Sequence, residues 1–289
     1  NLELNNYRYP FVDSPFYKSL KEKNFNKKYT KLCDELNENG YCILDFNIPE
    51  DLIDQANIDI KKSIKKNNIK LNSSAYHYNE SPRIVEAWKS SDAIKKIASN
   101  KKINNFLSYC YQSQAIPFST INFVKGAEQP LHSDEFHFGS IPHRYLTGCW
   151  IALEDISPNS GPLSIAVGSH KLPIFSFESI GLPIPKSPEE FKEYYTIYED
   201  WVREIIKSNN LKIATPLLKK GQVLVWLSNT LHGSYEIKDK SLTRQSLVVH
   251  FHYEKCEQIF YPSYSHLEKG KYIPRSLKDL DIRSKTLDD

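Results

Sequence analysis

Two histidines and one aspartate are the residues of this chain whose types and spacing could hold a reactive metal. His132, Ser133 and Asp134 form an H-x-D tripeptide, and His232 follows much later in the chain. Two imidazoles and one carboxylate can occupy one face of an octahedral metal and leave three positions open for small molecules, as in non-haem Fe(II) oxygenases. On a β-strand, His132 and Asp134 would point to the same side, because side chains alternate along a strand. These residues predict an open iron site, although the tripeptide alone also fits a surface turn.

The elements around the second histidine support this interpretation. His232 lies just beyond the apolar run 223–227, which predicts a buried strand from which a ligand can be presented. Arg244 follows twelve residues later and leads into another strand-like run, 247–251. An arginine facing inward from a barrel strand is a costly buried charge unless it meets a carboxylate, and its planar fork suits bidentate binding of one. Ser246 would add a hydroxyl donor on the same face. A 2-oxoglutarate molecule would suit both the metal and the arginine, because it can chelate the metal and offer its far carboxylate to Arg244.

Several longer stretches resemble the phytanoyl-CoA dioxygenase family of Fe(II)/2-oxoglutarate oxygenases. The resemblance extends from the segment at Gly40 to about Tyr261. It is most evident in Gln129–Phe138, Trp150–Ile156, Asn159–Leu163, Gly168–Lys171 and the segment 231–251. A match in several parts is more specific than the metal triplet alone.

The resemblance implies a cofactor set and a reaction. Fe(II) would be held by His132, Asp134 and His232, with 2-oxoglutarate as cosubstrate and O2 as oxidant. The enzyme would hydroxylate a C–H bond of a small polar metabolite, such as a sugar, an osmolyte or a natural-product intermediate, and release succinate and CO2. Halogenating relatives have a small residue in place of the aspartate, so the carboxylate of Asp134 favours hydroxylation or a related oxidation.

The resemblance also implies a double-stranded β-helix, or jelly roll, that is mainly β with flanking helices. We expect the chain 1–289 to form a single oxygenase domain. Residues 1–117 predict an N-terminal arm and mostly helical support. Residues 118–262 predict the jelly-roll core, because short apolar runs alternate there with Gly, Pro, Asn and Ser. A tyrosine-rich helical insertion is expected at about 187–208, and 263–289 would form a C-terminal tail.

Other polar residues are further candidates for the site. The family position of Ser234 suggests that it helps to hold 2-oxoglutarate. Asn122 and Gln129 flank the entry to the H-x-D segment and could donate hydrogen bonds to the cosubstrate or to a metal-bound water, or could be ordinary turn amides. His137 could contact substrate if a turn follows Asp134, whereas the resemblance implies that His170 belongs to a structural corner.

Two more histidines leave a choice open. His250 and His252 share one face of a predicted strand. An unbroken strand would place them on the face of Arg244 and Ser246, near metal or substrate, whereas a bulge would turn them outward.

The insertion around Tyr194–Trp201 fits either a lid over the site or an amphipathic helix that merely packs against the barrel. Aromatic side chains next to acids would suit polyhydroxylated or cationic small molecules. No basic cluster near this segment offers a handle for a nucleotide, which argues against an acyl-CoA substrate.

Composition excludes several other classes of protein. The chain has 289 residues and a net charge of +3, with 38 basic and 35 acidic side chains. No stripe of Lys and Arg with aromatic residues predicts binding to nucleic acid. No apolar stretch reaches the length of a membrane span, and no obligate protein partner is evident. The five cysteines include no CxxC pair, which favours a reducing, cytoplasmic location.

Two other function classes remain open from the sequence. One is a metal-binding protein on the same fold without enzymatic activity, and the other is a cupin-type enzyme that does not use 2-oxoglutarate. Arg244 argues against both, because neither needs a buried partner for a second carboxylate. Formation of succinate from 2-oxoglutarate would distinguish the first hypothesis from these two.

Overall fold

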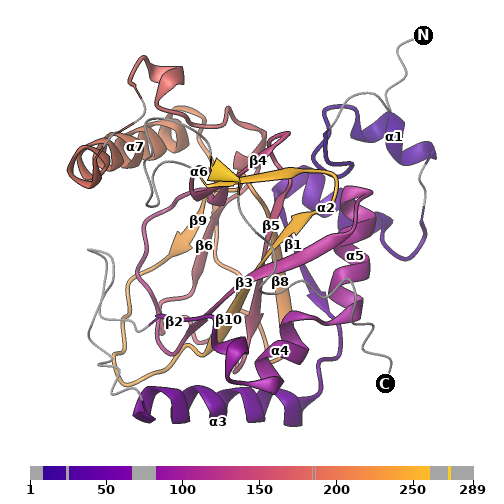
Figure 1. Ribbon diagram of the computed structural model, residues 1–289, viewed down its shortest axis with the longest axis vertical. Helices are drawn as coiled ribbons and strands as arrows, with labels where there is room; N and C mark the ends of the chain where they lie inside the picture. The colour runs from indigo at the N-terminus through magenta and orange to yellow at the C-terminus, as the bar shows by residue number, and fades with distance from the viewer. Residues whose placement is uncertain are drawn as a thin grey trace.

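The strands form the centre of the molecule and most helices lie on one side of them (Figure 1). The structure is a computed structural model and describes residues 9–23, 26–66, 83–183, 185, 187–260 and 273–274. Helix α3 (Glu50–Lys66) and helix α7 (Pro188–Ser208) lie at opposite ends of the strand layers.

A six-stranded antiparallel sheet, called the major sheet below, is the largest element. Its strand order is β1-β8-β5-β10-β3-β2. The strands are β1 (Tyr41–Asp45), β8 (Gln222–Leu227), β5 (Leu146–Ala152), β10 (Ser246–Tyr253), β3 (Ala115–Phe123) and β2 (Arg83–Val85). Neighbours in this sheet are far apart in sequence, which is the connectivity expected when a jelly roll wraps its strands.

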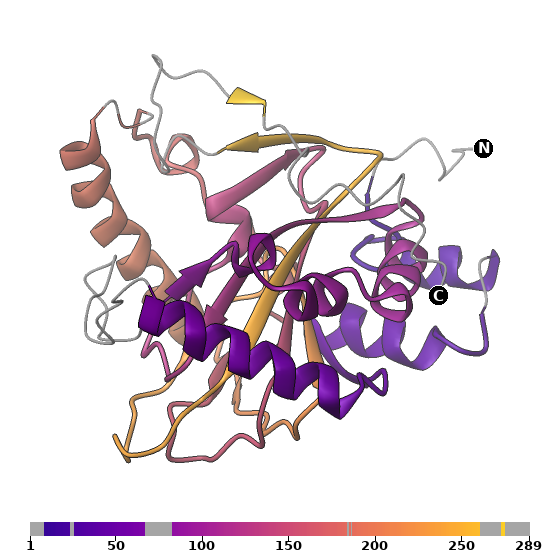
Figure 2. The same ribbon diagram turned by 60° about the horizontal axis from the view of Figure 1, so that its bottom comes forward.

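The alternation along β10 separates two apolar cores. Leu247, Val249 and Phe251 point into a core formed with the helices, whereas Val248 points into a second core between the sheets. The helical side is covered by α2 (Thr30–Asn39), α3, α4 (Asp92–Ala98) and α5 (Lys101–Tyr111). Figure 2 shows α3 running across the strands in front of the sheet. The helix buries Ile53, because its apolar residues recur at helical spacing.

Two three-stranded sheets lie on the other side. One has the order β7-β6-β9 and the other the order β12-β11-β4. Their strands are β7 (Ile213–Ala214), β6 (Leu163–Ala166), β9 (His232–Ser234), β12 (Ile273–Pro274), β11 (Glu257–Phe260) and β4 (Phe138–Ile141). The core between the major sheet and β6 contains Trp150, Leu224 and Leu163, so the space between the sheets is mainly filled by side chains.

The expected jelly roll with helical support from the first part of the chain is therefore confirmed. Helix α2 ends at Gly40, which adopts a left-handed conformation with φ 83° and whose N–H donates to the carbonyl of Leu36. The helical insertion is α7 and spans 21 residues. That the chain forms one domain stays a prediction, and most of the tail at 263–289 lies outside the described residues.

None of the helices in the described ranges combines the length and the apolar character that crossing a bilayer requires.

Candidate metal centre and adjoining cavity

Backbone pairing brings the two candidate histidines together. The N–H of His132 donates to the carbonyl of His232 at 2.9 Å, and the N–H of His232 donates back to the carbonyl of His132 at 2.9 Å. The two rings then lie side by side, with centroids 4.6 Å apart. Both residues are buried, so a ligand pair is held in place by main-chain geometry.

Asp134 reaches the same point by a different route from the predicted strand. Ser133 is the N-cap of the short helix α6 (Asp134–His137), and its hydroxyl accepts the N–H of Phe136 at 3.3 Å. The tripeptide is thus a strand-to-helix turn, and the expectation that it lies on one strand is wrong. The turn still converges, because the ligand atoms of His132, Asp134 and His232 all lie within 4.8 Å of one another.

Hydrogen bonds to carbonyl groups fix the protonation pattern of both rings. Nδ1 of His132 lies 2.9 Å from the carbonyl of Pro130, and Nδ1 of His232 lies 2.9 Å from the carbonyl of Thr230. A carbonyl only accepts, so each Nδ1 carries the proton and each Nε2 keeps a lone pair for a metal. Burial lowers the pKa of both histidines, which keeps the neutral imidazole that metal binding needs.

The carboxylate of Asp134 is held from two further sides. The indole N–H of Trp226 donates to Oδ2 at 2.7 Å, and Nε2 of His250 lies 3.4 Å from the same oxygen. The other oxygen, Oδ1, lies 3.7 Å from Nε2 of His232. Burial alone would raise the pKa of Asp134, but the surrounding histidines favour the charged form and the pKa is lowered overall.

A cavity extends from these three residues to Arg244. The space between the lining side chains, part of it open to solvent, is about 850 Å³. Its lining is mainly apolar and carries a few convergent polar groups, which is the usual composition of a small-molecule site.

Arg244 is a buried cation at the other end of this cavity. Its side chain is 2% exposed. Nη1 donates to the carbonyl of Gly161 at 2.8 Å, and the guanidinium lies near the rings of Phe123 and Trp150, at 5.8 Å and 5.7 Å. Nε has no hydrogen-bond partner, and no carboxylate of the described residues pairs with the group. Burial lowers its pKa to about 10, so it remains charged at neutral pH. Such an orphaned charge fits the far carboxylate of 2-oxoglutarate.

Three other predicted residues lie on the same side. Ser246 is fully buried and pairs with Phe123 across the sheet, and its hydroxyl has no partner among the described residues. The Ser234 hydroxyl accepts the backbone N–H of Gln129 at 3.0 Å, and both residues line the cavity. The amide nitrogen of Gln129 lies 3.1 Å from Nε2 of His132, which places this side chain beside the metal ligands.

Asn122 is not brought into the cavity, contrary to the prediction. It pairs with Leu247 on β10 and with Ile84 on β2, and both neighbours belong to the core on the helical side. Since directly paired residues of a sheet point to the same face, Asn122 faces the helices. The residues on either side of it, Ile121 and Phe123, line the cavity instead.

Of the other histidines considered from the sequence, His137 and His250 line the cavity, whereas His170 and His252 make contacts outside it. His137 lines the cavity, because the helical turn of α6 brings it inward. Nε2 of His170 lies 3.0 Å from the carbonyl of Asn37, which fits the predicted structural corner. His250 lines the cavity, while His252 stacks on Phe118 with centroids 4.1 Å apart.

The bulge that could have turned these two histidines outward lies on the neighbouring strand. His250 pairs with Ser119 and Phe251 pairs with Pro117, so the extra residue is Phe118 on β3. The pairing of β10 with β5 has no such shift. The alternation along β10 therefore continues through His250 and His252.

Two residues of the site were not predicted from the sequence. Trp226 was taken only as part of an apolar strand, and Arg83 was not singled out. Arg83 lines the cavity, and its Nη2 donates to the side-chain oxygen of Gln129 at 2.8 Å. No sequence pattern indicated this contact, because Arg83 is placed by the pairing of β2 with β3, where it lies opposite Phe123.

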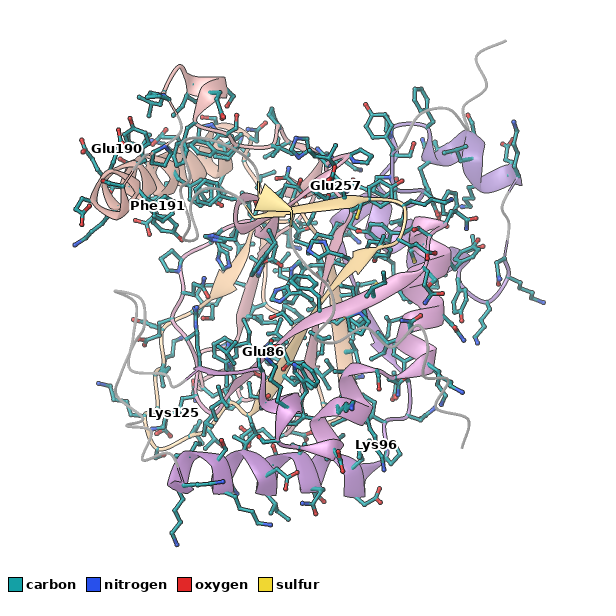
Figure 3. All side chains as sticks on the ribbon, viewed as in Figure 1. Glu86, Lys96, Lys125, Glu190, Phe191 and Glu257 are labelled. Atoms are coloured by element: carbon teal, nitrogen blue, oxygen red, sulfur yellow. The ribbon has the colours of Figure 1, made fainter. Side chains whose placement is uncertain are left out.

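Helix α7 packs against the barrel and reaches the cavity with one side chain. Tyr198 is buried against Phe136, with stacked rings 3.9 Å apart, and its hydroxyl accepts the N–H of Ser133 at 2.8 Å. Tyr195 lines the cavity. Figure 3 shows Glu190 and Phe191 on the same helix at the edge of the molecule. The helix is therefore packed against α6, with one tyrosine at the cavity.

Comparison with known proteins identifies relatives of this arrangement. The family profile described as phytanoyl-CoA dioxygenase (PhyH) matches residues 36–245. A search of curated protein sequences found no match.

Solved structures share the fold at low sequence identity. The carbocyclase SnoK from nogalamycin biosynthesis has a TM-score of 0.66 at 15% identity, covering 88% of this chain and 96% of that one. The epimerase SnoN, in complex with Fe3+, alpha-ketoglutarate and nogalamycin RO, has a TM-score of 0.61 at 15% identity, covering 86% and 94%. EctD from S. alaskensis, with 2-oxoglutarate and 5-hydroxyectoine, has a TM-score of 0.63 at 15% identity, covering 88% and 86%.

Proposed function

Because the chain belongs to the phytanoyl-CoA dioxygenase family of Fe(II)/2-oxoglutarate-dependent oxygenases, we propose that it hydroxylates a C–H bond of a small polar metabolite. 2-Oxoglutarate and O2 are consumed, and succinate and CO2 are released. One observation carries the proposal. The cavity has three convergent metal-ligand atoms at one end and a buried guanidinium without a carboxylate partner, among the described residues, at the other.

Each residue at these two ends has a role. His132 and His232 hold Fe(II) through Nε2, and Asp134 holds it through a carboxylate oxygen. Arg244 binds the far carboxylate of 2-oxoglutarate, and Ser246 offers a hydroxyl on the same face. When bound, the iron and its cosubstrate supply the oxidative chemistry, and the protein supplies orientation and a site that excludes water.

Ser234 and Gln129 act between the two ends. Ser234 holds the backbone of Gln129 in place and lines the cavity beside Gly233. Gln129 presents its amide nitrogen next to the ligand His132. With metal bound at Nε2, this N–H is available for an oxygen of the cosubstrate or for a metal-bound water.

The side chains that line the cavity indicate which substrates could bind there. Asp134 is the only carboxylate in the described lining, and it is assigned to the metal. The acids of α7 are not among the described lining residues, so of the two expected classes, polyhydroxylated or cationic, the cationic one has no support from them. Arg83, His137 and Tyr195 also line the cavity. We therefore propose a small polar metabolite that contacts these three side chains.

The solved relatives include an epimerase and a carbocyclase, so the reaction type needs its own test. The experiment incubates the protein with 2-oxoglutarate and O2, with and without Fe(II), and measures succinate. Slow turnover without substrate is expected only with Fe(II), and His232→Ala should abolish it. No succinate from the iron-loaded protein would contradict the proposal.

A panel of small metabolites is then screened for faster succinate formation, and the product is weighed by mass spectrometry. Hydroxylation adds one oxygen atom to the substrate, epimerisation leaves its mass unchanged, and ring closure removes two hydrogen atoms. A product without added oxygen would retain the oxygenase assignment and overturn the hydroxylase assignment.

We also propose a reducing, cytoplasmic location. All five cysteines are free in the structure, and four of them are buried. This supports the proposal, because none of them is used as a disulfide.

A further inference from the structure

Three residues on neighbouring strands form a row under the candidate metal centre. Gly148 on β5 pairs with Trp226 on β8 on one side and with His250 on β10 on the other. Both Trp226 and His250 point to the face of the major sheet that lines the cavity. Asp134 approaches this row from α6. Its Oδ2, called the outer oxygen below, accepts the indole N–H of Trp226 at 2.7 Å and lies 3.4 Å from Nε2 of His250.

The row has space for an indole only because its middle residue is glycine. A Cβ atom added to Gly148 would lie 2.2 Å from Cε2, 2.3 Å from Cζ2 and 2.5 Å from Nε1 of Trp226. Real Cβ contacts do not come so close, and these atoms belong to a rigid ring that is itself 2% exposed. The indole therefore lies flat across the backbone of Gly148, which brings its N–H to Asp134.

This arrangement separates the two oxygens of Asp134. Oδ2 is taken by the indole N–H, and Oδ1 lies on the side of His232, 3.7 Å from its Nε2. The same indole contacts the ring of His232, with centroids 4.3 Å apart and planes inclined by 33°. One side chain thus restrains two of the three candidate ligands.

We propose that Trp226, seated on Gly148, is a positioning residue that fixes Asp134 as a one-oxygen ligand of the metal. The inference rests on the proposed iron site and adds the residues that orient it. A donor held on the outer oxygen prevents the carboxylate from rotating to offer both oxygens. It also compensates part of the carboxylate charge without occupying a metal position.

The first test removes the indole N–H and keeps the aromatic ring. Fe(II) is titrated into the metal-free protein without oxygen and without 2-oxoglutarate, and the dissociation constant is compared between variants. Trp226→Phe should bind Fe(II) about 10- to 100-fold more weakly, which is the usual effect of losing a group that supports a ligand.

Trp150→Phe is the matched control for this measurement. Trp150 is also 2% exposed and lines the same cavity, but its indole N–H has no hydrogen-bond partner in the described part of the chain. Its replacement removes the same atoms without releasing Asp134, so the Fe(II) affinity should stay close to that of the wild type. Equal losses in both variants would assign the effect to packing and overturn the proposal.

The second test concerns Gly148. Gly148→Ala should push the indole away and weaken Fe(II) binding to a similar degree. A phenyl ring is smaller than an indole and leaves room for the added methyl group. The double variant that combines Gly148→Ala with Trp226→Phe should therefore bind Fe(II) no more weakly than Trp226→Phe alone. Additive losses would show that the two residues act independently and would overturn the coupling.

A third variant retains the shape of the ring and therefore does not depend on how well Trp226→Phe folds. Benzothienylalanine, in which sulfur replaces the indole N–H, is incorporated at position 226. Weaker Fe(II) binding with unchanged thermal unfolding of the metal-free protein supports the proposal, and wild-type affinity overturns it. If the wild-type protein itself binds no Fe(II), the iron site fails. If the wild type and all Trp226 variants bind equally, only this inference fails.

Discussion

Replacement of Arg244 tests the choice of cosubstrate most directly. In the structure its Nη1 is taken by the carbonyl of Gly161, while Nε has no partner and the whole side chain is buried. Removing one member of a buried, hydrogen-bonded charge pair costs on the order of 2–5 kcal/mol. At about 1.4 kcal/mol for each factor of ten, Arg244→Ala should weaken 2-oxoglutarate binding roughly 30- to 4000-fold. Arg244→Lys should recover only part of the loss, because an ammonium group cannot bind both carboxylate oxygens as the guanidinium does.

The assay is an anaerobic titration of 2-oxoglutarate into the Fe(II)-loaded protein, followed by the metal-to-ligand charge-transfer absorbance. Fe(II) affinity is measured separately and should barely change, because Arg244 lies at the opposite end of the cavity from the ligands. Equal 2-oxoglutarate binding in the wild type and both variants would remove Arg244 from the site and refute the reasoning.

Stability gives an independent readout of the same charge. A buried guanidinium without a carboxylate costs free energy in the protein that has no cosubstrate bound. Arg244→Met keeps most of the apolar volume and removes the charge, so the Tm of the metal-free protein should stay equal or rise. The increase in Tm that 2-oxoglutarate gives the iron-loaded wild type should be lost in this variant.

Three further predictions concern the residues around this cavity. Asp134→Gly should abolish hydroxylation, measured as added oxygen in the product, even if some Fe(II) remains bound to the two histidines; full activity would remove Asp134 from the ligands. Tyr198→Phe leaves the buried N–H of Ser133 without its acceptor and should lower the free energy of unfolding by about 1–3 kcal/mol. Tyr194→Phe, in which the lost hydroxyl donates to Glu190 on the same helix, should change it little. Burial lowers the pKa of His170 from 6.5 to about 4, so the folded protein binds fewer protons than the unfolded chain between these values. The free energy of unfolding should therefore fall as the pH falls from 6.5 to 4, by up to about 3 kcal/mol. His170→Asn should flatten this part of the denaturation profile, and an unchanged slope would count against the assignment.

The convergence of the candidate metal ligands could be predicted from the sequence, but the local structure of the tripeptide was predicted wrongly. A strand was assumed because i and i+2 share a face. The sequence also contains a signal for a helix, since Ser133 is a preferred N-cap and the acids Asp134 and Glu135 follow it in the first turn. Either geometry brings residues 132 and 134 together, which is why the error did not affect the predicted ligands.

The prediction for Asn122 failed for a different reason. In a strand buried on both faces, apolar residues give no alternation from which the inward face can be read. The burial pattern of β3 has no exposed position and only one that is partly exposed. The face of Asn122 is set by its register with Leu247, and this depends on a strand more than a hundred residues away in the chain.

The position of the bulge beside His250 does have a basis in the sequence. Pro117 lies within β3 and has no N–H to donate, so an irregular pairing is more favourable on this strand than on β10. Because Pro117 favours a bulge on β3, the alternation of β10 is expected to continue and His250 to stay on the inward face. Trp226 and Gly148 offered no such signal, because neither an apolar strand residue nor a single glycine indicates a long-range contact with Asp134.

The residues proposed for the chemistry and those proposed to contact the substrate come from different parts of the fold. Trp226 and His250, proposed to support the iron site, and Arg244, proposed to bind the cosubstrate, belong to the strands of the major sheet or to the segment directly before β10. Arg83 and Tyr195, proposed to contact the substrate, come instead from the edge strand β2 and from the inserted helix α7. Edge strands and insertions can change without disturbing the core, whereas the inner face of the major sheet cannot. Substrate choice in this protein should therefore follow changes at Arg83 and Tyr195, while the requirement for Fe(II) and 2-oxoglutarate stays unchanged.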